Sequence, residues 1–239
     1  MVSTKGTLLA ICDGRKCNTI DYRHINLVCK RSFDNGGTWE PMELLWDGRA
    51  NTAGNPAPVV DQQTGTIWLL WVKTNTDLFA MKSTDDGETW SKPKALIDNK
   101  NWLRVGTGPC HGIQIGNGRL ITPCWTRVAA GPHPINYSQI IYNNDHGRTW
   151  QIGAPVGPYM NEAVAVELDG GKVYLNMLNY THLREFAVSR DGGESFGELE
   201  HDPIHLPGSR RQDSDPLCQS CLPGKAVRLF QTVHYDSAG

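Results

Sequence analysis

An eight-residue motif recurs four times along the chain and constrains its fold more than any other feature. Each copy follows the pattern Ser/Asn-x-Asp-x-Gly-x-Thr/Ser-aromatic, and the copies occupy residues 32–39, 83–90, 143–150 and 189–196. Their aspartates are 51, 60 and 46 residues apart, at Asp34, Asp85, Asp145 and Asp191. About 50 residues is the length of a four-stranded propeller blade. The spacing therefore predicts a repeated β-sheet unit.

Each residue type in the motif has a local structural reason. An aspartate side chain accepts hydrogen bonds from backbone N–H groups a few residues on, a glycine supplies a positive φ, and a Ser or Thr hydroxyl holds the other side of the turn. We expect the aromatic residue to pack into the next layer. Because four identical copies cannot all serve one active site, we interpret the four aspartates as structural.

The segments between the motifs have the composition of β-strands. They are rich in β-branched and aromatic residues, as in residues 7–11, 25–30, 66–72, 120–124, 139–142, 173–177 and 186–188. No amphipathic helical stretch of any length competes with them. The sequence therefore predicts an all-β propeller.

Composition and charge exclude several classes of protein. The 239 residues are 39% hydrophobic and 20% charged, which is typical of globular domains. The formal net charge is −2, and no basic stripe of the kind that binds nucleic acid is present. No apolar run approaches the roughly 20 residues that span a bilayer, and the N-terminus lacks a signal-peptide core. We therefore expect neither nucleic acid nor a membrane span.

The cysteines favour a reducing compartment over a disulfide scaffold. There are seven, an odd number, and they are scattered along the chain. Cys218 and Cys221 have the spacing of a zinc knuckle, but no second pair accompanies them. We therefore predict no metal site and no other cofactor.

The repeated motif resembles the Asp-box, or BNR repeat, of the sialidase (neuraminidase) family, a six-bladed propeller that removes terminal sialic acids. Residues 6–15 look like the family's second strand, which ends in Glu/Asp-x-Arg, and residues 19–24 look like the acidic loop that follows it. Residues 25–32, 55–61, 106–120 and 161–168 continue the similarity in register. The resemblance thus implies one sialidase-like domain over residues 1–239.

The resemblance also implies an incomplete ring. Six blades of about 50 residues need roughly 300 residues, so we expect this chain to supply about four to five. The family's first carboxylate-binding arginine belongs to an Arg-Ile-Pro strand that precedes Gly6-Thr7. Its third arginine and its tyrosine nucleophile belong to the last two blades, beyond Gly239. We therefore expect truncation at both ends.

Three residues match the family's catalytic pattern. In the family, arginines bind the carboxylate of sialic acid, an Asp is the general acid/base, and a Glu activates a tyrosine nucleophile. Asp21 matches the acid/base, Glu162 the activator, and Arg15 a substrate-binding arginine. The alternatives are a solvated loop residue for Asp21, a strand-end carboxylate paired with a cation for Glu162, and a surface ion pair for Arg15.

One position departs from the pattern. The second carboxylate-binding arginine lies in a Leu-Asn-x-Arg-Asn context, and the matching position here is Leu178, which cannot bind a carboxylate. Arg184, a few residues on, is a candidate substitute for substrate binding, with pairing to nearby carboxylates as the alternative.

Three functions remain open from sequence alone. The first is a retaining exo-α-sialidase acting on a sialylated glycan or glycoconjugate. The second is a non-catalytic sialic-acid or glycan-binding propeller, and the third is an inactive fragment of a sialidase. Leu178 and the absent segments favour the second and third, whereas the residue-by-residue similarity favours the first.

Overall fold

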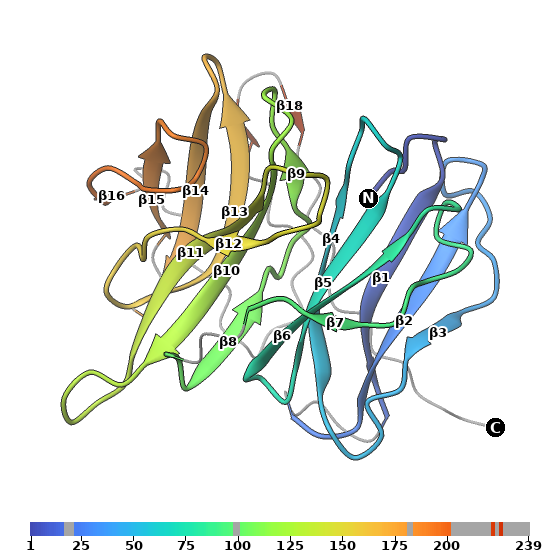
Figure 1. Cartoon of the computed structure of the whole chain (residues 1–239), viewed down its shortest axis with the longest axis horizontal. Coiled ribbons are helices and arrows are strands. Elements are labelled where there is room, and N and C mark those ends of the chain that lie inside the picture. The colour runs from blue at the N-terminus through green and yellow to red at the C-terminus, as the bar shows by residue number, and fades with distance from the viewer. Residues whose placement is uncertain (17–21, 98–100, 181–183, 202–220, 223–224, 227–239) are drawn as a thin grey trace.

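The computed structural model describes residues 1–16, 22–97, 101–180, 184–201, 221–222 and 225–226. Every regular element within these ranges is a β-strand, which confirms the all-β prediction. The strands form four antiparallel sheets that follow one another along the chain, and a short hairpin (Figure 1). Within the described ranges, no helix has the length and apolar character needed to cross a membrane.

The four sheets share one pattern of consecutive strands. The first contains β1 (Leu8–Arg15), β2 (Ile25–Ser32) and β3 (Glu43–Trp46). The second contains β4 (Ala53–Val60), β5 (Ile67–Lys73), β6 (Asp77–Ser83) and β7 (Lys94–Ala95). The third contains β8 (Arg104–Thr107), β9 (Ile113–Gln114), β10 (Leu120–Val128), β11 (Ile135–Asn143) and β12 (Gln151–Ile152). The fourth contains β13 (Met160–Leu168), β14 (Lys172–Asn179), β15 (Arg184–Ser189) and β16 (Glu200–His201), and the hairpin pairs β17 (Cys221–Leu222) with β18 (Lys225–Ala226).

The repeated turns occupy the same place in every sheet. In the second, third and fourth sheets the motif connects the strand next to the outer edge with the outermost strand, such as β6 with β7. In the first sheet it connects β2 with β3, so β1 corresponds to β5, β10 and β14. Among the described residues, the first sheet has no full counterpart of the inner strands β4, β8 and β13. Within the described ranges, the edge of β1 is paired by a bridge between Val2 and Leu8, flanked by hydrogen bonds between Met1 and Leu9.

The hydrogen bonds of the turns are those expected from the motif. In the second copy, Asp85 Oδ1 accepts a bond from the backbone N–H of Thr89 at 2.9 Å and from the Ser83 hydroxyl at 2.7 Å. The same hydroxyl accepts the N–H of Gly87 at 2.8 Å. Equivalent bonds form in the other three copies, with Asn143 replacing the serine in the third. The prediction of side-chain-stabilised turns is therefore confirmed.

The glycine of the motif also lies against the preceding sheet, which the sequence did not predict. Gly147 has a φ of +83°, and a Cβ added there would come within 2.1 Å of the indole of Trp68 on β5. A Cβ on Gly87, at a φ of +82°, would come within 2.5 Å of Leu9 on β1. Glycine is therefore needed at these positions for close packing as well as for its backbone conformation.

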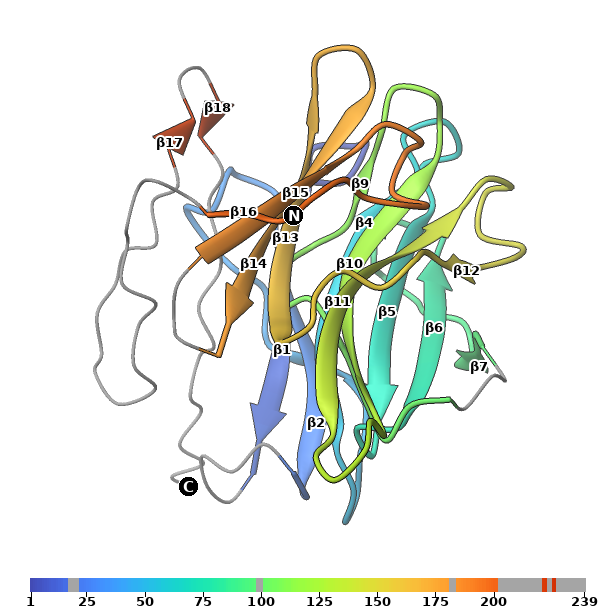
Figure 2. The ribbon, with the colours of Figure 1, turned by 90° about the vertical axis from the view of Figure 1, so that its left-hand side faces the viewer.

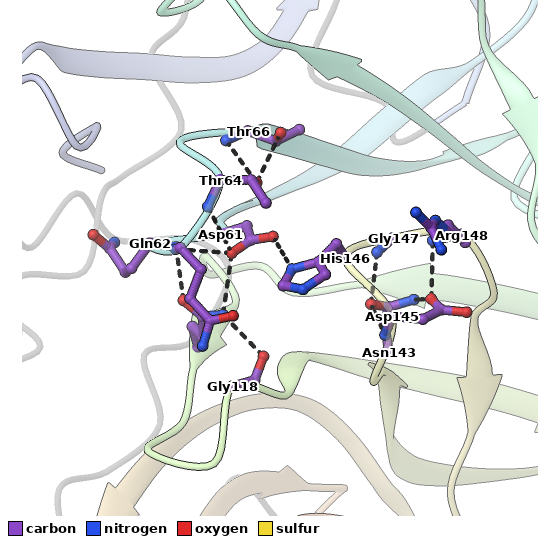
Figure 3. A network of polar contacts seen from close by, with 12 residues as sticks. Asp61, Gln62, Thr64, Thr66, Gly118, Asn143, Asp145, His146, Gly147 and Arg148 are labelled. Atoms are coloured by element: carbon purple, nitrogen blue, oxygen red, sulfur yellow. Dashed lines mark hydrogen bonds and ion pairs between the residues drawn. The ribbon is translucent and has the colours of Figure 1, made fainter.

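The residue between the aspartate and the glycine binds the preceding sheet as well. Asp86 accepts a hydrogen bond from the Thr7 hydroxyl. His146 Nδ1 lies 2.7 Å from the carboxylate of Asp61, as Figure 3 shows. At the fourth turn the carbonyl of Gly192 accepts a bond from Arg119 at 3.1 Å. Each of these three turns is therefore fixed to the sheet before it.

The aromatic residue of the motif completes this contact. Trp150 is 9% exposed and packs edge-on against Trp68, with ring centroids 5.9 Å apart. Trp39, in the first copy, is 39% exposed, because the described residues place no sheet before the first. The expectation that the aromatic packs into a neighbouring layer is confirmed for Trp150, whose neighbouring layer is the preceding sheet, and it does not hold for Trp39.

Substitution of Gly147 tests the close approach between sheets. We expect Gly147→Ala to lower the free energy of unfolding by about 1–3 kcal/mol more than Gly170→Ala does. Gly170 is the matched control because its φ is +76° and an added Cβ meets no atom within 4 Å. Urea denaturation measures both variants, and equal losses would show that the contact with Trp68 does not require glycine.

The motif aspartates predict a specific pH dependence. Hydrogen bonds from the hydroxyl and backbone N–H of Thr89 and from the Ser83 hydroxyl lower the pKa of Asp85 from 3.8 to about 2. Because the pKa of the folded state is the lower one, the carboxylate stabilises the fold above about pH 4, and this contribution is lost as the pH falls towards 2. We expect the urea midpoint to fall over that interval and Asp85→Asn to flatten the decline. Asp169→Asn, in a turn outside the repeat, is the control, and an equally steep decline in Asp85→Asn would contradict the assignment.

Candidate active site

The candidate residues lie at the end of the sheets opposite the repeated turns. The strands β1, β5 and β14 all run downwards in Figure 2, and each is paired with the next strand along the chain, β2, β6 and β15. Arg15 is the last residue of β1, Arg184 is the first residue of β15, and Glu162 lies near the start of β13. Asp21 lies outside the described residues, in the connection between β1 and β2. The fold therefore places Arg15, Glu162 and Arg184 at a common end.

Glu162 lies in a β-bulge. Met160 pairs with Asn179 and Ala163 pairs with Met177, so β13 has one more residue than β14 over this interval. Such an extra residue locally turns a side chain away from the regular alternation of the strand. The inner strand β4 has the same irregularity between Gly54 and Ala57. The bulge is thus a repeated feature of the inner strands, and Glu162 is the carboxylate that the fourth sheet places there.

Arg184 lies directly opposite Leu178 in the register of β14 and β15. Residues paired in this way project from the same face of an antiparallel sheet, with Cβ atoms about 5 Å apart. The Nε of Arg184 donates a hydrogen bond to Asn176 Oδ1 at 2.6 Å, and Asn176 lies two residues before Leu178 on that face. The guanidinium is therefore held beside the position where the resemblance calls for an arginine.

A buried thiol lies close to this arginine. Cys110 is 8% exposed, and its Sγ donates a hydrogen bond to the carbonyl of Ala163 at 3.3 Å, next to the bulge that carries Glu162. Burial raises the pKa of Cys110 to about 12, and the positive charge of Arg184 acts in the opposite direction. The thiol is therefore a neutral group at physiological pH, and it connects the third sheet to the fourth.

Arg15 is paired rather than isolated. One of its terminal nitrogens lies 3.6 Å from Asp13 Oδ2, and the side chains are only 14% and 15% exposed. Asp13 Oδ1 also accepts the N–H of Asn55 at 3.1 Å, in the bulge of β4. The alternative that Arg15 forms an ion pair thus has a specific partner in Asp13. Through Asp13, the pair links the first sheet to the second.

Sequence analysis assigned no role in the site to two residues that hold the candidate arginines. Asn176 holds Arg184, and Asp13 holds Arg15. The similarity of Asn55-Pro56-Ala57 to Asn161-Glu162-Ala163 was the available signal that the inner strands share a bulge. Asn176 is the first asparagine of the Leu-Asn-x-Arg-Asn context, but its contact with Arg184 depends on which strand lies beside it, and no local pattern specifies that.

The described residues contain no group of three or more His, Cys, Asp or Glu side chains that could hold a metal ion. The cysteines at positions 12, 29, 110 and 124 are free. The side chains of Cys17, Cys218 and Cys221 lie outside the described residues.

The chain resembles known proteins over nearly its whole length. The family model of the BNR repeat-like domain matches residues 6–217. A sialidase from Bacteroides fragilis is 29% identical, with the match covering 87% of this chain and 44% of the relative. An exo-alpha-sialidase from Aspergillus fumigatus is 31% identical, with the match covering 99% of this chain and 62% of the relative.

Solved structures give the same result. The Hadza microbial sialidase Hz136 superposes with a TM-score of 0.75 at 29% identity, over 87% of this chain and 45% of that one. The Trypanosoma rangeli sialidase, at 19% identity and a TM-score of 0.69, supports the fold alone. The chain spans about half the length of these relatives. Together with the four Asp-box sheets, these matches show that the chain belongs to the BNR repeat-like domain family and is a sialidase-type propeller chain.

Proposed function

We propose that this chain carries part of the active site of a retaining exo-α-sialidase that releases terminal sialic acid from glycoconjugates. Asp21 is the general acid/base, Glu162 activates a tyrosine nucleophile, and Arg15 and Arg184 bind substrate. Membership of the family supports the reaction class. The position of Arg15, Glu162 and Arg184 at one end of the sheets supports the assignment of these residues.

The reaction explains why these residue types are needed. Sialic acid carries a carboxylate on its anomeric carbon, so a carboxylate nucleophile would be repelled and a tyrosine is better suited. Glu162 would take the proton of that tyrosine, while Asp21 would protonate the leaving oxygen and later activate water. A guanidinium binds a carboxylate through two parallel hydrogen bonds. The domain proposed for this chemistry spans residues 1–239.

The pairing of Arg184 with Leu178 is the observation that carries the proposal. Leucine at position 178 removes one of the cations that the resemblance implies, and that loss alone would favour a chain without turnover. Arg184 restores a positive charge on the same face of the sheet, one strand away. Its hydrogen bond to Asn176 limits the orientations of the guanidinium, so less freedom is lost when a carboxylate binds.

Turnover by a protein that joins this chain to the remaining blades of a sialidase tests the catalytic assignments, because those blades supply the tyrosine. In that protein we expect hydrolysis of a fluorogenic α-sialoside, with Asp21→Asn and Glu162→Gln each lowering kcat by about 10²–10⁴. Asp169→Asn is the matched control and should leave kcat unchanged. Saturable binding of sialic acid without turnover would indicate a glycan-binding propeller instead, and absence of both would contradict the proposal.

Exchange of the arginine between strands tests substrate binding. We expect Arg184→Leu to weaken binding of N-acetylneuraminic acid by about 10–100-fold, because a charge-assisted hydrogen bond is worth about 1.5–3 kcal/mol. Leu178→Arg in the Arg184→Leu background should recover most of this loss. Arg190→Leu, which removes an exposed arginine at the opposite end, is the control for net charge. Binding that is insensitive to Arg184 would assign that residue a purely structural role.

A further inference from the structure

A cavity of about 430 Å³ lies between the first and second sheets, apart from the candidate active site. It is lined by Trp46, Trp71, Lys73, Phe79, Lys92 and Pro93. Trp46 ends β3, and Lys92 and Pro93 precede β7, so the outermost strand of the first sheet and the connection into the outermost strand of the second both contribute. The volume is in the range of small-molecule sites.

Three aromatic rings form one wall of this cavity. Trp71 stacks on Phe79 with centroids 5.2 Å apart, and it lies 5.8 Å from Trp46 at a tilt of 40°. Trp71 is fully buried, whereas Trp46 and Phe79 are only partly buried. The two outer rings therefore retain exposed surface on which a ligand ring can stack.

Two lysines give the cavity a positive character. Lys73 Nζ lies 5.9 Å from the centroid of the Phe79 ring, and Lys92 lines the cavity from the connection before β7. Asp77 lies directly opposite Lys73 in the register of β5 and β6. Its carboxylate therefore competes with any anionic ligand for this lysine.

We propose that this cavity is an accessory binding site for a carboxylated sugar. The apolar face of the sugar ring stacks on the exposed surface of Trp46 and Phe79, and its carboxylate pairs with Lys73 and Lys92. The choice of a sugar over another carboxylic acid rests on the proposed function. On a surface with many acidic sugars, such a site would raise the effective concentration of substrate at the active site.

Fluorine NMR of the full chain labelled with 5-fluorotryptophan tests the proposal. The Trp46 and Trp71 resonances are assigned with Trp46→Phe and Trp71→Phe, and N-acetylneuraminic acid is titrated to about 10 mM, enough to nearly saturate a site with a Kd of about 1 mM. We expect saturable shifts of both resonances, with an unchanged Kd in the Arg184→Leu background. The Arg184→Leu variant lacks an arginine of the proposed active site, so binding measured in it reports the cavity alone. Each of the two proposals can therefore fail without the other.

Charge and ligand variants determine the chemistry of the site. We expect Lys73→Met combined with Lys92→Met to weaken binding about tenfold, Asp77→Asn to strengthen it, and Lys94→Met, an exposed neighbour outside the cavity, to have no effect. The methyl ester of the sugar should bind more weakly than the acid. Absence of saturable shifts, equal binding of acid and ester, or shifts with benzoate but not with the sugar would each overturn the proposal.

Discussion

The contact between each Asp-box turn and the preceding sheet is the constraint on which the rest of the structure depends. At three successive turns a glycine without a Cβ lets the backbone approach the neighbouring sheet, at Gly87, Gly147 and Gly193. The residue before that glycine binds the same sheet through Thr7, Asp61 or Arg119. Burial would raise the pKa of Asp61, but hydrogen bonds led by the one from His146 lower it, so this link is an ionised carboxylate. Turns fixed in this way set the angle between sheets, and the opposite ends of the sheets are free to carry irregular loops.

This separation of the Asp-box turns from the irregular loops explains why the candidate site lies at the end of the sheets opposite the turns. The Asp-box turns occupy one end of the sheets, and the bulges of β4 and β13 lie at the other end, with Arg15, Glu162 and Arg184. Under the proposed function, Leu178, Arg184 and Asn176 are an example of a site that changes within such a frame. Two adjacent strands in register offer nearly equivalent positions for one guanidinium, so β15 would supply the cation that the family resemblance places on β14.

The fold was largely predictable from sequence, and the site only in part. The Asp-box spacing and the β-branched runs predicted the sheets, because both signals are local and repeated. The sequence also assigned Asp85 a structural role, which the hydrogen bonds to Thr89 and Ser83 confirm. The contact of Gly147 with Trp68 and the anchoring of Arg184 by Asn176 depend on pairings between separate segments, which no local pattern specifies. The roles of Asp21, Glu162 and Arg15 stay predictions.

A crystal structure of the chain with N-acetylneuraminic acid bound would test the central claim most directly. The account predicts the sugar carboxylate within hydrogen-bonding distance of the Arg184 guanidinium, beside Leu178, with Glu162 on the same side of the ring. A carboxylate bound without any contact to Arg184, while that residue keeps its hydrogen bond to Asn176, would contradict it.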